Sequence, residues 1–114
     1  MQGKIVKKIG EQEYTFKFNI NAYIAFCDLY TGEPGNFADI FSKNPFKAMR
    51  DLFFVALNNT EGGKPVNELP KGFNRELVGE WIDEMDQDDF NEIQKVALEA
   101  MTSRFKGEGG GKKK

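Results

Sequence analysis

The sequence contains no histidine and a single cysteine, Cys27. Without histidine, the chain lacks the residue that most often acts as a general base near neutral pH and that commonly binds zinc. It therefore cannot build a Ser-His-Asp or Cys-His catalytic arrangement. One thiol cannot form an internal disulfide, and Cys27 falls on the apolar face of a predicted helix, where we interpret it as a small buried hydrophobe. We predict that the chain is not an enzyme, with no catalytic residues and no cofactor.

The sequence also lacks long apolar runs and a large excess of charge of either sign. No stretch approaches the roughly eighteen apolar residues of a membrane span, and the N-terminal segment MQGKIVKKIG has no signal-peptide core. The 16 Lys and Arg residues are balanced by 18 Asp and Glu residues, for a net charge of -2. Such a chain has no overall positive field to attract phosphates. We expect a cytoplasmic protein that binds neither membrane nor nucleic acid.

Acidic residues are densest between Asp83 and Asp89, but their spacing does not form a calcium loop. In a loop that starts at Asp86, the fifth position is Phe90, and the sixth is Asn91 where a glycine is required. We interpret these acids as favourable charges at the start of a helix. No metal site is predicted.

Aromatic residues are plentiful, with 11 Phe, 3 Tyr and one Trp in 114 residues. The segment from Tyr14 to Gly32 shows how they are used, because its apolar period changes from two residues to about 3.6. Tyr14, Phe16, Phe18 and Ile20 would share one face of a strand, and a helix would follow from Asn21, with Ile24 widening its apolar stripe and Gly32 as a stop. Lys4 to Ile9 also alternates, and Gly10-Glu11-Gln12 separates it from a strand at 13–18. The pattern predicts a β-hairpin that feeds a helix.

Four further helices are predicted from capping residues and apolar spacing. Asn36 would cap a short helix over 37–42, and Asn44-Pro45 would open a central helix that runs to Asn58. The segment from Asn58 to Pro70 holds two glycines and two prolines and reads as the longest loop. The last two helices are expected at 75–85, capped by Asn74, and from Asp86 to an end at Gly107.

These elements predict an α+β fold in which a short N-terminal antiparallel β-hairpin packs on a bundle of four to five helices. Residues 1–107 would form one domain, and residues 108–114, a Gly/Lys tail, would be disordered. The residues expected to be buried are spread over the hairpin and three helices: Phe16, Phe18, Phe26, Leu52, Phe53, Trp81 and Ile82.

The order of these parts resembles a known family of assembly proteins. The segments that carry the resemblance are YTFKFN running into NAYIAFCDLYTGE, then FKAMRDLFFVALNN, and then ELVGEWIDEM before a closing helix. This pattern resembles the tail assembly chaperones of long-tailed bacteriophages and related gene transfer agents, over Gly3 to about Met101. The resemblance implies a protein that does no chemistry. It would keep the tape measure protein soluble and help tail tube subunits to polymerise around it.

Partner binding would need exposed apolar side chains, and several large ones lie on short elements. A core of this size would leave some of them at the surface as an adhesive patch. The candidate partner-binding residues are Phe37, Ile40, Phe41 and Phe46, with Phe73 as a further surplus residue. The alternative for the phenylalanines is that they belong to the core. A head-tail joining subunit or a regulatory, protein-binding adaptor is the alternative function.

Overall fold

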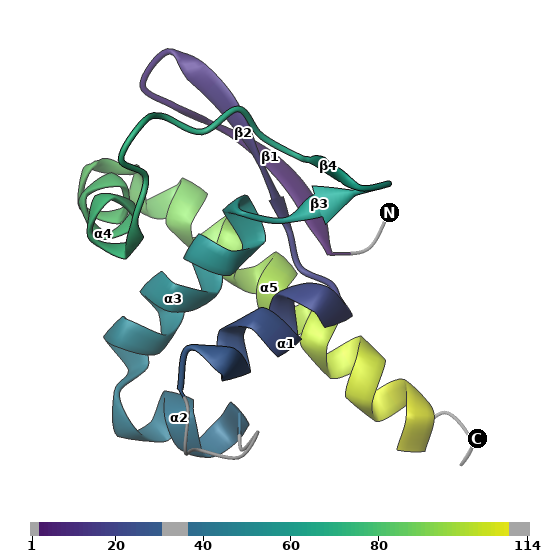
Figure 1. The fold of residues 1–114 in the computed structure, drawn as a ribbon. Coiled ribbons are helices and arrows are strands. Elements are labelled where there is room, and N and C mark those ends of the chain that lie inside the picture. Colours follow the sequence, from purple (N-terminus) through teal and green to yellow (C-terminus); the bar gives the residue numbers. More distant parts are fainter. Residues whose placement is uncertain (1–2, 31–36, 110–114) are drawn as a thin grey trace.

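The computed structural model describes the backbone of residues 3–30 and 37–109 and the side chains of residues 3–30 and 40–100. The fold is α+β (Figure 1). The strands β1 (Lys4–Ile9) and β2 (Gln12–Lys17) form an antiparallel hairpin that packs on helices. The helices are α1 (Ile20–Asp28), α2 (Phe37–Lys43), α3 (Pro45–Leu57), α4 (Arg75–Glu84) and α5 (Gln87–Gly109). The predicted hairpin and helical bundle are thereby confirmed.

The hairpin places its aromatic residues on the core side, as the alternation predicts. Ile9 pairs with Gln12, so Gly10 and Glu11 form a two-residue loop. Gly10 has φ +68°, which suits the first position of a type II′ turn. The aromatic side chains that follow in and just after β2 are almost fully buried, with 6%, 1% and 2% exposure for Tyr14, Phe16 and Phe18.

The strand ends earlier than the apolar alternation indicates. The side chain of Asn19 accepts a hydrogen bond from the Ala22 N–H at 3.0 Å and so caps α1. Ile20 is consequently the first residue of the helix, and its side chain is exposed instead of extending the buried face of the strand. The prediction for Ile20 was wrong for this reason. Ile24, one turn later on the same side, is also exposed, while the predicted stop at Gly32 lies outside the described residues.

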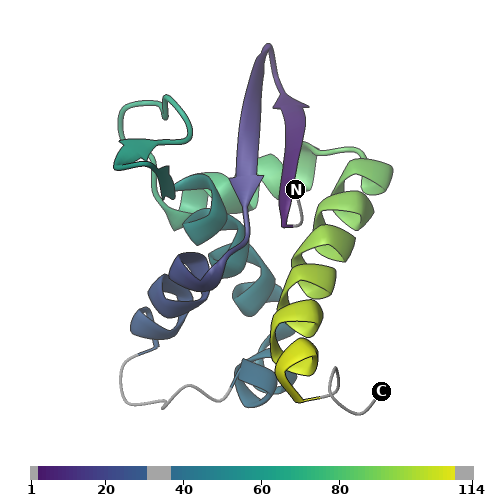
Figure 2. The same cartoon turned by 90° about the vertical axis from the view of Figure 1, so that its right-hand side faces the viewer.

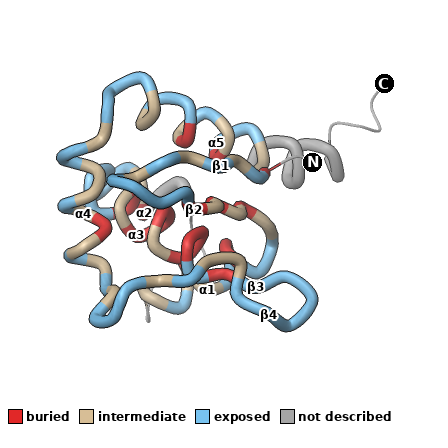
Figure 3. The backbone as a smooth tube through the Cα atoms, turned by 90° about the horizontal axis from the view of Figure 1, so that it is seen from above, coloured by how far each residue is buried: buried red, intermediate tan, exposed pale blue. Residues whose placement is uncertain are grey.

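Helix α3 is the central element, as its wide apolar stripe predicts. It contacts α1, α2, α4 and β2. Asn44 caps it by accepting a hydrogen bond from the Lys47 N–H at 3.4 Å, and Pro45 occupies the first helical position. Phe53 is fully buried, with ring centroids 5.5 Å from Phe16 and 5.6 Å from Phe90. In Figure 3 the buried residues gather where α3 faces α1 and β2.

The segment predicted as the longest loop has more structure than its composition indicates. It contains two short paired strands, β3 (Thr60–Glu61) and β4 (Lys64–Pro65). Asn59 Nδ2 donates a hydrogen bond to the carbonyl of Lys17 at 2.9 Å. The side chain of Asn67 accepts a hydrogen bond from the Thr15 N–H at 2.7 Å and donates one to the Thr15 carbonyl at 2.8 Å. The two asparagines therefore satisfy backbone groups on the outer edge of β2 and hold the segment against the hairpin.

The last two helices differ from prediction in burial and length. Asn74 caps α4 through the Leu77 N–H at 2.9 Å, as predicted. Trp81 and Ile82, however, are only partly buried. Ile82 borders an open groove described below, and Trp81 packs on Tyr14 and Phe73. Helix α5 runs alongside the rest of the bundle to Gly109, two residues past the predicted end at Gly107 (Figure 2). The rest of the predicted tail, residues 110–114, lies outside the described part of the chain.

Candidate protein-binding groove

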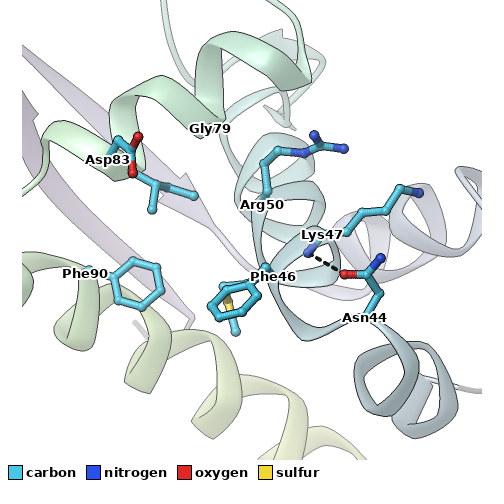
Figure 4. Close-up of a pocket in the computed structure, with 9 residues that line it drawn as sticks. Asn44, Phe46, Lys47, Arg50, Gly79, Asp83 and Phe90 are labelled. Carbon is cyan, nitrogen blue, oxygen red and sulfur yellow. Dashed lines mark hydrogen bonds between the residues drawn. The ribbon is translucent and has the colours of Figure 1, made fainter.

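A groove opens between α3 and α4 near the start of α5 (Figure 4). Its volume is about 460 Å³. It is bordered by four apolar side chains, three charged ones, a capping asparagine and a glycine: Phe46, Met49, Ile82, Phe90, Lys47, Arg50, Asp83, Asn44 and Gly79. We call these nine residues the α3–α4 groove.

Phe46 is the most exposed large hydrophobic residue in the part of the chain described, at 88% of its surface. Its exposure follows from its position. Asn44 and Pro45 begin α3, and in the first turn that follows Ala48 points into the core whereas Phe46 points out of it. Met49, three residues later on the same side of α3, is buried. Phe46 thus stands in solvent directly beside buried apolar residues.

Charged residues from two helices border the groove, and the charged ends of Lys47 and Arg50 point away from Phe46 and Phe90 (Figure 4). Lys47 and Arg50 come from α3, whereas Asp83 comes from α4 on the other side. Between them lies Gly79, where a β-carbon would sit 3.5 Å from Cδ of Arg50. The absent side chain leaves room above the Arg50 stem and keeps this part of the groove open.

Next to Arg50 on α3 lies a fully buried carboxylate, Asp51, with 0% exposure. Its Oδ1 accepts a hydrogen bond from Arg50 Nε at 2.9 Å and lies 2.8 Å from Arg50 Nη2. Its Oδ2 accepts hydrogen bonds from the Tyr30 hydroxyl at 2.7 Å and from Arg75 Nη1 at 3.4 Å. Because Tyr30 follows α1 and Arg75 begins α4, Asp51 joins three segments of the fold.

The cluster around Asp51 has more positive than negative charge. Arg50, Arg75 and Lys47, whose Nζ lies 3.9 Å from Asp51 Oδ2, supply three positive charges against one negative charge. Lys47 Nζ also lies 4.6 Å above the ring of Tyr30, a cation–π contact. Burial, followed by the hydrogen bond to Asp51, raises the pKa of Tyr30, so its hydroxyl stays protonated as a donor. The charged ends of Lys47 and Arg50 lie at Asp51, and Figure 4 shows both side chains directed away from Phe46 and Phe90.

The four predicted partner-binding residues occupy different environments. Phe46 is exposed in the groove, but Ile40 is 4% exposed and belongs to the core, which removes it from any surface patch. Phe41 is partly buried, with its ring 5.6 Å from that of Phe26, and the side chain of Phe37 lies outside the described residues. The further surplus residue Phe73 packs on Phe54 at 5.3 Å. Of the predicted patch residues whose side chains are described, Phe46 alone lines the α3–α4 groove.

Sequence reasoning missed the other groove residues and Asp51. Met49, Ile82 and Phe90 each lie on the apolar stripe of their helix, and such a position by itself predicts burial in the core. Nothing in the helical period distinguishes a stripe residue in the core from one at an open edge. An acid in the middle of an otherwise apolar helix face is the signal that could have indicated the Asp51 cluster.

Comparison of the chain with protein-family models, curated proteins and solved structures finds no match. Over the described residues, no three His, Cys, Asp or Glu side chains gather into a possible metal site. None of the helices in that part of the chain is both long and apolar enough to cross a bilayer.

Proposed function

We propose that this protein is a phage tail assembly chaperone that works in the host cytoplasm and holds an apolar segment of the tape measure protein in the α3–α4 groove. The observation that carries the proposal is Phe46, a phenylalanine 88% exposed beside an open apolar groove. An exposed aromatic side chain that is continuous with further apolar residues of a groove is a feature of binding surfaces. The family assignment rests on the sequence resemblance.

The groove suits reversible holding of a partner. Its apolar residues can bury a hydrophobic side chain of an unassembled protein, and its charged edges stay in contact with water. An aromatic residue at the centre of such a surface commonly contributes most of the binding energy. By covering apolar segments of the tape measure protein, the chaperone would prevent aggregation until tail tube subunits take its place.

Replacing Phe46 with serine is expected to abolish much of the chaperone effect without unfolding the protein. Coexpression with wild type should keep a tape measure fragment soluble, and Phe46→Ser should weaken its affinity for that fragment by about tenfold or more. The measurements are the soluble fraction of the fragment and its affinity for each purified variant. Because Phe46 is almost fully exposed, its replacement should leave stability within about 0.5 kcal/mol.

Ile24→Ser provides the matched control. Ile24 is also exposed, at 53%, but lies on α1 and does not line the groove. This variant should solubilise the fragment as well as wild type does. If the Phe46→Ser protein is folded and solubilises the fragment as well as wild type does, the groove is not the binding surface. If the wild-type protein does not solubilise the fragment, the proposed chaperone function is wrong.

A further inference from the structure

The outer edge of β2 presents backbone groups at every second residue. Ile9 pairs with Gln12 across the two-residue loop, and in such a hairpin this pair exchanges both of its backbone hydrogen bonds. The N–H and C=O groups of the alternate residues therefore point away from β1. On β2 these residues are Glu13, Thr15 and Lys17. They form an edge to which a further strand could be added.

Residues 59–67, which we call the edge cover, occupy this edge with side chains in place of a strand. The amide of Asn67 accepts a hydrogen bond from the Thr15 N–H at 2.7 Å and donates one to the Thr15 carbonyl at 2.8 Å. A residue of an added antiparallel strand would make the same two bonds. Next along the edge, Glu61 Oε1 lies 3.6 Å from Lys17 Nζ. The edge cover thus supplies a peptide-like group at Thr15 and a carboxylate at Lys17.

The edge cover is held by polar contacts. Within residues 60–67, all of which the structure describes, no side chain belongs to the buried core, whereas Leu69 and Phe73 beyond them pack against that core. Hydrogen bonds and exposed ion pairs contribute little net stability, because water replaces them when they break. A segment with few apolar contacts opens at a lower free energy than the core does. Opening would expose the β2 edge while the aromatic face of the hairpin stays packed.

The charges along the β2 edge are complementary to those of a second β2 edge. In an antiparallel pair of two β2 strands centred on Thr15, Glu13 of each copy faces Lys17 of the other. Opposite charges directly across a strand pair stabilise it, and like charges destabilise it. The outer edge of β1 lacks this property, because an antiparallel pair of two β1 strands centred midway between Lys4 and Lys8 would place these lysines opposite each other.

We propose that the β2 edge is an interface between two copies of this chain, and that the edge cover prevents the pairing while it is closed. Asn67 and Glu61 take the places that Thr15 and Glu13 of the second copy would occupy. Figure 2 shows that the hairpin extends past the helices toward its turn, where a second copy can approach it. The paired form has one sheet of four strands, in the order β1-β2-β2-β1. The inference goes beyond the proposed function and does not involve the α3–α4 groove.

Opening the edge cover is expected to strengthen dimer formation. Asn67→Ala removes both bonds to Thr15, and sedimentation equilibrium should give a dimer dissociation constant about tenfold or more below that of wild type. Glu61→Gln, at an exposed residue that tolerates substitution, should lower the constant about twofold and keeps the test available if Asn67→Ala does not fold. Asn91→Ala, the same chemical change at an exposed position on α5, should behave like wild type. Circular dichroism shows whether each variant is folded.

Charge reversal in the opened variant tests the register of the interface. Glu13→Lys places two lysines opposite each other at both ends of the pair, and Lys17→Glu does the same with two glutamates. Each single reversal should weaken the dimer about tenfold. The two reversals together exchange the charges, so the double variant should dimerise about as strongly as its parent.

Hydrogen exchange of the Thr15 amide locates the contact. In Asn67→Ala this amide should exchange faster than in wild type at low protein concentration, and its exchange should slow as the concentration rises and the second copy binds. Dissociation constants of Asn67→Ala and Glu61→Gln equal to that of wild type would overturn the inference. A dimer that tolerates either single charge reversal, or one in which the Thr15 amide exchanges at the same rate at all concentrations, would form through another surface and would also overturn it.

Discussion

Replacing Phe53 with alanine is expected to lower the free energy of unfolding by about 3–5 kcal/mol. Phe53 has no exposed surface, and its ring lies between the hairpin residues Phe16 and Phe18 and the α5 residue Phe90. Removing the ring leaves a cavity at the point where strand and helices meet, and the aromatic contacts with Phe16, Phe18 and Phe90 are lost. Urea denaturation monitored by circular dichroism measures the change.

Phe46→Ala is a closely matched control for this prediction. The residue type and the helix are the same, but Phe46 is 88% exposed, so its truncation should change stability by no more than about 0.5 kcal/mol. A loss below about 1 kcal/mol for Phe53→Ala would mean that α3 is not the centre of the core. The comparison also shows whether the groove variant used for partner binding keeps its fold.

The second large effect is expected at Asp51. Asp51→Asn keeps the shape of the side chain but removes a buried charge that accepts bonds from Tyr30, Arg50 and Arg75. Removing one member of a buried ion pair typically costs 3–5 kcal/mol. Here the cations are partly exposed and can regain water, so we expect a loss of about 2–4 kcal/mol.

Asp83→Asn serves as the control for the Asp51 substitution. It makes the same chemical change at an exposed acid on α4, and stability should stay within about 0.5 kcal/mol. Equal stabilities of the Asp51 and Asp83 variants in chemical denaturation would contradict the view that Asp51 joins α1, α3 and α4. Asp51→Asn should also loosen Arg50 at the groove, since Asp51 Oδ1 holds its guanidinium.

Local patterns in the sequence predict most of the backbone. The alternation of Tyr14, Phe16 and Phe18 gives the buried face of β2, and the asparagines at 44 and 74 give the starts of α3 and α4. Each of these features involves residues only a few positions apart in the sequence. The pleat of a strand sets the alternation, and an N–H group in the first turn of a helix binds the capping side chain. Such short-range chemistry is visible in a single sequence.

The candidate site depends on contacts between distant residues, and so it was mostly not predictable. Asp51 is buried because Tyr30 and Arg75, 21 and 24 residues away, reach it in the folded chain. Asn67 orders the long loop through Thr15, 52 residues earlier. Phe46 shares the apolar stripe of α3, and only the placement of the other helices decides that its turn lies in water.

The most direct test of the groove as the binding surface is a methyl NMR titration of the labelled chain with a soluble tape measure fragment. The expected result is that the methyl signals of Met49 and Ile82 shift as the fragment is added, because both residues line the groove. Signals of Val6 and Leu98, which are exposed elsewhere, should stay in place. Unchanged Met49 and Ile82 signals, with shifts confined to residues outside the groove or with none at all, would contradict the proposal.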